Sequence, residues 1–514
     1  MPNLAEDLRG WIAASRRRVA AASLEPRLDH IGRVLQVGDG VATVAGLPET
    51  RLDELLLFED GTRGLAVDLG EETIGCILLG GGTGIKAGGI VKGTGEVASA
   101  PVGEGLLGRV VDALGRPLDG GEAPGFQRMA PVGQPAPAIV DRDLVTVPLA
   151  TGLLAVDAMI PLGRGQRELI IGDRGIGKTA IALDAIINQR SSDVISVYAA
   201  IGQKASAVAR VVDAVKTYGA PERCLFVVGE ADAPAGLQWL TPYSACTMAE
   251  HFMAAGRDVL LVIDDLTKHA AVYRQVSLLL RRPPGREAYP GDIFYIHARL
   301  LERAAKLSPE RGGGSLTALP IAETQAGNMS AYIPTNLISI TDGQIYLDPR
   351  LFYEDQKPAV DIGKSVSRVG GATQAPVLKG LSESLRLEYA QFLELEVFTR
   401  FGTMVDERTR KLIEHGRRIR AVLAQAQYAP LSLGEQVALL TAVAEGVLDE
   451  LPLDRIDAFR AGLGARLATD CPGALAVDAR MAALPEGVAG PLKTALKSLA
   501  DSLKEAAKEA GRPG

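Results

Sequence analysis

The stretch that decides the fold is Gly172-Asp173-Arg174-Gly175-Ile176-Gly177-Lys178-Thr179, which matches the pattern G-x-x-x-x-G-K-[ST]. An apolar segment, 168–171, precedes it as a candidate strand, and 180–188 follows it as a candidate helix. Glycines let backbone N–H groups turn toward phosphate oxygens, and the positive end of the following helix points at the same place. The sequence therefore predicts a P-loop, which is a phosphate-binding turn between a strand and a helix.

The P-loop pattern predicts specific ligand contacts. Lys178 is expected to contact the β- and γ-phosphates, and the Thr179 hydroxyl is expected to ligate Mg²⁺. P-loop proteins also need an acidic residue at the end of a neighbouring strand. The apolar run 259–263 ends in Asp264 and Asp265, and Asp264 is the first polar residue after it. We expect Asp264 to hold the Mg²⁺ shell through water, with an ordinary strand-end cap as the alternative.

Composition limits the class of protein. With 514 residues the chain is long enough for about three domains. Its formal net charge of −7 argues against a dedicated nucleic-acid binder, which usually carries a basic surface. No apolar run reaches the roughly 18 residues that a membrane span needs, so other subunits would have to hold the chain at a membrane. Four well-separated cysteines, without a C-x-x-C pair, predict buried free thiols in a reducing cytoplasm.

The sequence changes character along its length, which predicts its domains. Residues 1–23 have apolar residues at helical spacing and predict an amphipathic N-terminal helix, whose arginine run forms a solvated face. Residues 24–97 contain short β-branched runs between glycine and aspartate turns, as in a small β-barrel. Residues 98–378 begin with a proline- and glycine-rich transition and then alternate apolar strands with helices, as in an α/β domain with a parallel sheet. Residues 379–514 predict a helical domain, in which Leu492, Leu496, Leu499 and Leu503 share one face.

Three further segments make the sequence resemble a known family. They are 278–287 (LLLRRPPGRE), 314–320 (GSLTALP) and 365–371 (SVSRVGG). Together with the P-loop they closely resemble the alpha subunit of F-type ATP synthases, over about residues 24–440. The resemblance implies a multidomain chain with an N-terminal β-barrel, a central RecA-like α/β P-loop domain and a C-terminal α-helical domain. It also implies a hexameric ring in which alpha subunits alternate with catalytic beta subunits around a gamma central stalk. Peripheral stalk subunits and a membrane sector would complete the assembly.

The resemblance assigns roles to two residues outside the P-loop. In the beta subunits a glutamate after the second strand polarises the attacking water, and Gln203 stands at the matching position here. An amide cannot serve as a carboxylate base, so the site is expected to bind Mg-ATP or ADP without turning it over. The arginine that matches Arg368 reaches the γ-phosphate of the neighbouring subunit, so Arg368 is expected to be catalytic in trans. A strand-capping glutamine and a structural salt-bridge arginine are the alternatives.

The resemblance also implies how the nucleotide is held. Residues 172–180, ending in Ala180, would surround the phosphates. Four side chains match alpha-type positions near the base, namely Phe352, Pro358, Gln425 and Gln427. The segment 289–292 matches a loop that faces the central stalk.

Some positions depart from the family pattern. Most alpha subunits have Gln and Thr where this chain has Gly175 and Ile176, and Lys357 replaces the usual arginine. Lysine and arginine are not interchangeable at a stacked site, so nucleotide is expected to bind more weakly or exchange faster. The pattern resembles the alternate, N-type bacterial branch, which is thought to pump protons or sodium ions outward. The expected location is the cytoplasmic face of the bacterial inner membrane, as a peripheral protein.

Other functions of the same fold remain open at this stage. A self-sufficient homohexameric export ATPase is the main alternative, and Gln203 counts against it because such an enzyme needs the carboxylate. A ring translocase on RNA would need a basic central groove, which the acidic balance disfavours. A purely structural subunit that binds no nucleotide is compatible with Gly175 and Ile176.

Overall fold

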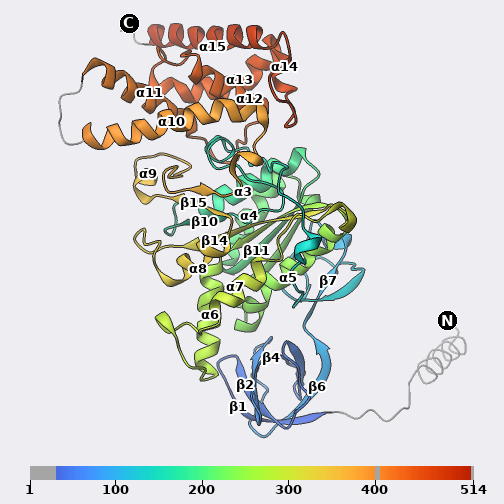
Figure 1. Cartoon of the computed structure of the whole chain (residues 1–514). Helices are drawn as coiled ribbons and strands as arrows, with labels where there is room; N and C mark the ends of the chain where they lie inside the picture. Colours follow the sequence, from blue (N-terminus) through green and yellow to red (C-terminus); the bar gives the residue numbers. More distant parts are fainter. Residues whose placement is uncertain (1–29, 400–405, 511–514) are drawn as a thin grey trace, which may run out of the picture.

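The computed structural model describes residues 30–399 and 406–510, which stack as a barrel, a nucleotide-binding-type sheet domain and a helical domain (Figure 1). This order confirms the fold predicted from the sequence. The predicted helix over residues 1–23 lies outside the described residues. The domain limits at 97/98 and 378/379 stay predictions, although β6 ends at Val97 and α10 begins at Pro376.

The N-terminal domain is a closed six-stranded barrel with the strand order β1-β2-β5-β4-β3-β6. Its strands are β1 (Ile31–Gly38), β2 (Val41–Ala45), β3 (Glu54–Phe58), β4 (Arg63–Leu69), β5 (Thr73–Leu78) and β6 (Ile90–Val97). Asp39 and Gly40 both have positive φ angles, 50° and 81°, in the two-residue turn between β1 and β2. That backbone suits a tight hairpin, as the Gly-Asp-Gly turn predicted. Val44, Leu56 and Cys76 fill the interior.

A mainly parallel sheet forms the central domain, with the order β16-β15-β10-β14-β13-β11-β12-β8. Its strands are β8 (Val110–Val111), β10 (Leu169–Gly172), β11 (Ile195–Gln203), β12 (Cys224–Glu230), β13 (Asp258–Asp264), β14 (Ser315–Glu323), β15 (Gly343–Leu347) and β16 (Val366–Ser367). β16 is the antiparallel edge strand, paired with β15. A separate two-stranded sheet joins β7 (Ser99–Val102) to β9 (Arg128–Pro131). Apolar runs at 169–171, 194–201, 224–228 and 259–263 predict strands, and the structure confirms them as β10, β11, β12 and β13.

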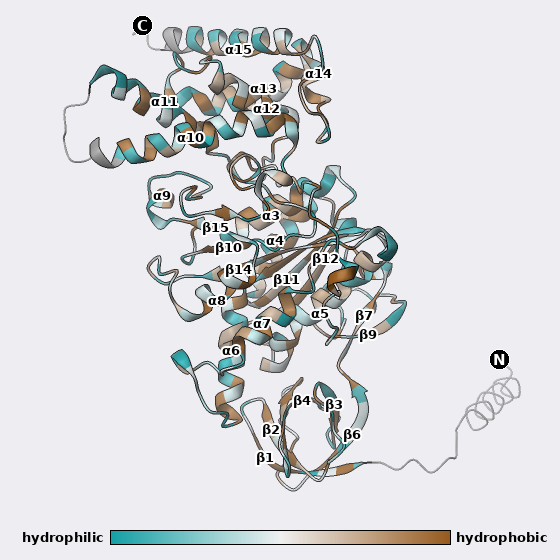
Figure 2. Cartoon of the chain, in the orientation of Figure 1, coloured by the Kyte–Doolittle hydropathy of each residue, from teal (hydrophilic) through white to brown (hydrophobic). Residues whose placement is uncertain are grey.

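Helices cover both faces of this sheet. They are α2 (Leu154–Asp157), α3 (Lys178–Asn188), α4 (Ala205–Tyr218), α5 (Ala235–Ala254), α6 (Leu266–Leu279), α7 (Ile293–Leu301), α8 (Tyr332–Ile340) and α9 (Pro349–Tyr353). Along β13, Leu260 and Val262 join the core on the α3/α4 side, whereas Leu261 and Ile263 join the core on the α5–α8 side. Burial on both faces explains why the strands are apolar at successive positions, and Figure 2 shows them as hydrophobic ribbons inside the domain.

The C-terminal domain consists of α10 (Pro376–Thr399), α11 (Glu407–Leu423), α12 (Leu433–Ala444), α13 (Ile456–Asp470), α14 (Pro472–Leu475) and α15 (Ala489–Ala510). The predicted leucine face of α15 packs inward, because Leu492, Leu496 and Leu499 are buried. Their core is continuous with the core on the α3/α4 side of the sheet. The four cysteines are free and buried, as predicted. Within the described residues, no helix is long and apolar enough to cross a bilayer.

Candidate nucleotide-binding site

The P-loop joins β10 to α3 and has the backbone that phosphate binding needs. Gly175 and Gly177 have positive φ angles of 79° and 102°, which lie in the left-handed region that favours glycine. α3 begins at Lys178, and its N-cap is Gly177, which has no side chain to cap the helix. The first N–H groups of α3 are therefore directed at the loop, where a phosphate oxygen can accept from them.

Two departures from the family pattern have different structural consequences. Ile176 is 3% exposed and joins the apolar core beneath the loop, so only its backbone can face phosphate. A Cβ placed on Gly175 would meet no atom within 4 Å, so the left-handed backbone, not crowding, favours glycine there. Arg174 is exposed, and Thr179 and Ala180 are half-buried at the start of α3. Asp173 anchors the loop, because its Oδ1 accepts from Thr324 Oγ1 at 2.5 Å and from the Gly327 N–H at 2.9 Å.

Lys178 is buried and lies across the loop. Its Nζ donates to the carbonyl oxygens of Gly172 at 2.9 Å and Asp173 at 2.6 Å. Burial lowers the pKa of Lys178, and the nearby acids, Glu323 first, oppose that shift. Glu323 Oε1 lies 4.0 Å from Nζ, at the end of β14 beside β10. Sequence reasoning missed Glu323, although its position as the last residue of a buried strand was a signal like that of Asp264.

Asp264, at the carboxyl end of β13, accepts hydrogen bonds from three side chains, one on α3 and two on β11. Its Oδ2 accepts from Thr179 Oγ1 at 2.8 Å and from the Tyr198 hydroxyl at 2.7 Å. Its Oδ1 accepts from Gln203 Nε2 at 2.8 Å. Asp265 instead accepts the Lys268 N–H and caps α6, and burial raises its pKa to about 7. Of the two aspartates, Asp264 is therefore the one that faces the P-loop.

This donor set fits a magnesium ion. Mg²⁺ prefers oxygen ligands and in phosphate sites takes one or two of them from protein, with substrate phosphates and water completing the shell. The Thr179 hydroxyl and the Asp264 carboxylate, which lie 2.8 Å apart beside the P-loop, supply such oxygens. These two residues would hold the ion, which would supply positive charge to offset that of the phosphates.

The residues predicted near the base come together from two domains. Phe352 lies on α9, and Lys357 Nζ lies 5.3 Å from the centre of its ring, just before Pro358. The backbone N–H of Gln425 donates to the Lys357 carbonyl at 2.7 Å. Gln427, two residues further along the chain, is exposed.

The side chain of Gln425 is used internally. Its Oε1 accepts from the Leu154 N–H at 3.1 Å, and its Nε2 donates to the carbonyls of Gly152 and Ala429 at 2.8 and 2.7 Å. Gln425 therefore fixes the segment after α11 to the central domain, a structural role that its sequence position did not indicate. Gln427 is the exposed amide of the pair.

The same segment contacts the P-loop helix. The Tyr428 N–H donates to Asp184 Oδ1 on α3 at 2.8 Å, and the Tyr428 ring stacks on Tyr218 with centroids 4.9 Å apart. Burial raises the pKa of Asp184 to about 6, against the opposing hydrogen bond from Tyr428. Sequence reasoning missed Asp184, because a single aspartate in an amphipathic helix gives no signal of a long-range contact.

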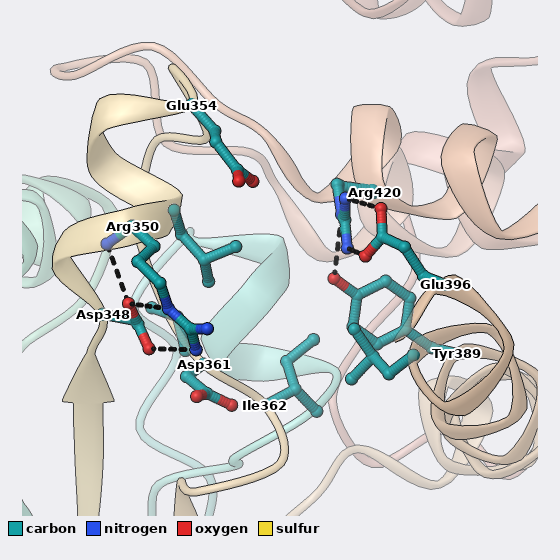
Figure 3. A pocket seen from close by; sticks show the side chains of 11 residues that line it. Asp348, Arg350, Glu354, Asp361, Ile362, Tyr389, Glu396 and Arg420 are labelled. Atoms are coloured by element: carbon teal, nitrogen blue, oxygen red, sulfur yellow. Dashed lines mark hydrogen bonds and ion pairs between the residues drawn. The ribbon is translucent and has the colours of Figure 1, made fainter. Parts of the chain in front are cut away.

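A polar cavity of about 350 Å³ separates the α9 region from α10 and α11 (Figure 3). On one wall Asp348 accepts from Arg350, and on the other Arg420 donates to both oxygens of Glu396, at 2.7 and 2.5 Å. Gln356 spans the two sides, because its Nε2 donates to the Arg420 carbonyl at 3.1 Å. The loop before Pro358 is thus tied to the helical domain.

Arg368 lies away from the P-loop of its own chain. It follows β16, whose Ser367 pairs with Gly343 at the start of β15, whereas the P-loop follows the end of β10. Since β15 and β10 are parallel, Arg368 and Lys178 lie toward opposite ends of the sheet. The side chain is exposed, and its guanidinium donates a long 3.4 Å hydrogen bond to the Ile338 carbonyl.

Comparison with known proteins agrees with this architecture. Residues 28–95 match the β-barrel domain of the ATP synthase alpha/beta family, residues 152–367 its nucleotide-binding domain, and residues 374–499 its C-terminal domain. ATP synthase subunit alpha 3 of Paraburkholderia xenovorans is 59% identical over 466 residues, which cover 91% of this chain and 88% of the relative. ATP synthase subunit alpha 2 of Gluconobacter oxydans is 58% identical, covering 88% and 90%. ATP synthase subunit alpha 1 of P. xenovorans is also 58% identical, covering 86% and 87%. The chain therefore belongs to the alpha-subunit family of ATP synthases.

Proposed function

We propose that this chain is the noncatalytic alpha subunit of a rotary F-type ATPase, which binds Mg-ATP or Mg-ADP and donates Arg368 to the catalytic site of a neighbouring beta subunit. The observation that carries the proposal is an amide at position 203 beside the P-loop acid, because Gln203 Nε2 donates to Asp264 Oδ1 at 2.8 Å. An amide in this place can hold a metal-shell carboxylate in position but cannot take a proton from water.

The exposed guanidinium of Arg368 supports the second half of the proposal. It lies toward the far end of the sheet from Lys178, and it is exposed with a long 3.4 Å hydrogen bond to the Ile338 carbonyl, so it is free to extend toward another subunit. A guanidinium stabilises the charge that spreads over the oxygens of a transferred phosphoryl group. The ring would alternate alpha and beta subunits around a gamma stalk, with peripheral stalk subunits attaching it to the membrane sector on the cytoplasmic face.

Gly175 and Ile176 support a place in the alternate bacterial branch. Two of the relatives are alpha 1 and alpha 3 subunits of Paraburkholderia xenovorans, so that organism has more than one alpha subunit. The membrane ring would decide whether protons or sodium ions are moved, and it belongs to other chains.

Turnover by the purified chain tests the noncatalytic assignment. We expect the chain alone to bind a fluorescent ATP analogue with Mg²⁺ and to hydrolyse ATP at least about a hundredfold more slowly than the ~1 s⁻¹ of a slow ordinary enzyme. Lys178→Ala should abolish binding and serves as the control. Robust hydrolysis that disappears in Glu323→Gln would show that Glu323 acts as the base, and would contradict the proposal.

A further inference from the structure

Glu168 is a buried carboxyl group that the nucleotide site does not use. It immediately precedes β10, at the opposite end of that strand from the P-loop, and its exposed fraction is 0%. Burying an ionised carboxylate is costly unless a cation or several donors satisfy it. Within the described residues no ion pair is found for Glu168, so an ion pair does not explain how this carboxyl group is accommodated in the interior.

One oxygen of Glu168 is linked to the strand that carries Arg368. Gln166 Nε2 donates to Glu168 Oε2 at 2.7 Å and lies 3.1 Å from Ser367 Oγ. Ser367 immediately precedes Arg368, donates to the Pro161 carbonyl at 2.9 Å and accepts the Gly370 N–H at 3.1 Å. A single amide therefore connects the buried acid to the residue beside the proposed finger.

The other oxygen packs against the same strand. Glu168 Oε1 has no hydrogen-bond partner among the described residues. A Cβ added to Gly343 would lie 2.8 Å from this oxygen and 2.1 Å from the Val366 carbonyl oxygen. Glycine at 343 thus lets the carboxyl group lie directly against the pairing of β15 with β16. If Oε1 carried a proton, or were replaced by the amide nitrogen of a glutamine, this donor would face the region that contains the Val366 carbonyl oxygen.

Burial favours the neutral form of Glu168, whereas the charges around it act in opposite directions. Asp342 is close by, but its carboxylate is already paired with Arg167, at 3.0 and 2.9 Å, and Arg167 also pairs with Glu302. Burial raises the pKa of Glu168 well above its usual range, and Asp342 adds to that rise. The hydrogen bond from Gln166 and the positive charge of Arg368 act in the opposite direction.

We propose that Glu168 is a positioning residue for Arg368: as a neutral acid it holds β16 in place from beneath, without drawing the guanidinium inward. This inference rests on the proposed finger role of Arg368. A neutral group is suited to the task, because a carboxylate at this position would compete with the neighbouring phosphate for the guanidinium. Glu168 would contact neither substrate nor metal and would act only through the geometry of Arg368.

Substitutions in the assembled complex test the proposal. Glu168→Gln keeps the shape and a donor, and we expect it to retain at least about half of the kcat for ATP hydrolysis. Glu168→Leu removes both polar atoms, and we expect kcat to fall at least about tenfold while KM changes less than about twofold. Equal loss in both variants would show that the ionised form is needed, and unchanged kcat in Glu168→Leu would show that the acid has no role; either result overturns the proposal.

A double-mutant cycle separates positioning from general stability. In an Arg368→Lys background, measured by single-turnover hydrolysis, Glu168→Leu should lower the rate less than about twofold, because the group through which it acts has already been altered. A full tenfold effect in that background would overturn the positioning role. Near-normal kcat in Arg368→Lys alone would instead refute the finger itself, whatever Glu168 does.

A milder variant covers the case in which Glu168→Leu does not assemble. Ser367→Ala removes one hydroxyl group and breaks the link from Gln166 to β16. We expect it to lower kcat at least about threefold at unchanged KM, with assembly followed by native mass spectrometry. Unchanged kcat in Ser367→Ala would overturn the proposal without any need for the leucine variant.

Discussion

At the residue scale, two polar side chains define what the nucleotide site can do. Gln203 and Asp264 face each other at the ends of β11 and β13, which are adjacent parallel strands. Because the carboxyl ends of parallel strands meet at one edge of the sheet, a substitution of either residue changes the same part of the site. If the proposed function holds, one amide in place of one carboxylate is what makes this a binding site and not an active site.

Arg368→Lys tests the contribution of this chain to its neighbour. Lysine keeps the charge but loses the planar fork that contacts several phosphoryl oxygens. We expect assembly to be normal, since the guanidinium is exposed and its hydrogen bond to the Ile338 carbonyl is long at 3.4 Å, and hydrolysis by the complex to fall by about 10³-fold or more. Steady-state ATPase assays on the purified complex measure this, and near wild-type turnover would exclude the role.

Asp184→Asn should change how pH affects the contact between α3 and Tyr428. The folded pKa of Asp184, about 6, exceeds its ordinary value of 3.8, so folding favours the protonated form. The stability from this group is complete below the ordinary pKa and is lost as pH rises through 6, a loss of about 2–3 kcal/mol. Asparagine keeps the acceptor for the Tyr428 N–H without the charge.

Hydrogen exchange measures this effect locally. At about pH 8, amides of α3 and residues 424–431 should exchange more slowly in Asp184→Asn than in wild type, whereas near pH 4 the two should match. Asp213→Asn, at an exposed position of α4, is the control and should not change the exchange of these amides at either pH. Faster exchange in Asp184→Asn at about pH 8 would mean that the carboxylate charge stabilises the contact.

At the element scale, α10 and α11 pack so closely that one glycine is required. A Cβ on Gly416 of α11 would lie 2.0 Å from Cγ of Phe392, a buried residue of α10. Arg420, one turn further along, joins Glu396 and stacks over Phe392 with 4.8 Å to the ring centre. The helix pair is therefore held together by the Phe392 ring, which packs against Gly416, and by the ion pair of Arg420 with Glu396.

Gly416→Ala should loosen this pair. We expect overpacking to destabilise the helical domain by about 1–3 kcal/mol, measured by calorimetry or by exchange of α10 and α11 amides. Gly380→Ala, in α10, is the matched control, because a Cβ there meets nothing within 4 Å. That control should be neutral or stabilising by up to about 1 kcal/mol, since alanine is the better helix former. Equal effects of both substitutions would show that the close approach does not matter.

Element type was predictable where burial enforced a pattern. Apolar runs indicated β10, β11, β12 and β13 because both faces of the sheet are covered, and leucine spacing indicated α15. The position of β16 was not predictable, because a two-residue edge strand has no periodicity of its own. Pairing of Ser367 with Gly343 depends on tertiary contacts, among them the Gln166 bridge.

The candidate site was predictable to the extent that it follows sequence motifs. The P-loop, Thr179 and Asp264 were found from strand ends, and the structure brings them within hydrogen-bond distance. Glu323 was missed although it ends a buried strand. Asp184 was missed because its partner Tyr428 is distant in sequence, and Glu168 because β16 beside it is. The internal use of Gln425 was missed for the same reason, since its partners lie near residue 152.

At the scale of the whole molecule, the Mg-nucleotide site should remain loaded only while the P-loop lysine is present. In the purified complex, denaturation should release nucleotide in excess of that bound by the beta subunits. Lys178→Gln should remove that excess and leave hydrolysis at the beta sites within about threefold of normal. Luminometric and chromatographic assays of the released nucleotide measure it, and an unchanged content would place the nucleotide elsewhere.

The segment after α11, which Gln425 holds against the central domain, is a pivot point between the helical domain and the central domain. It is pinned at Gly152 and Leu154 on one side and reaches Asp184 through Tyr428 on the other. If the site binds a purine nucleotide as proposed, a force on the helical domain would be transmitted through this segment to the base end of the site. Occupancy of that end and the tilt of α11 would then be coupled, so a bound nucleotide that is not hydrolysed would still resist movement of the helical domain.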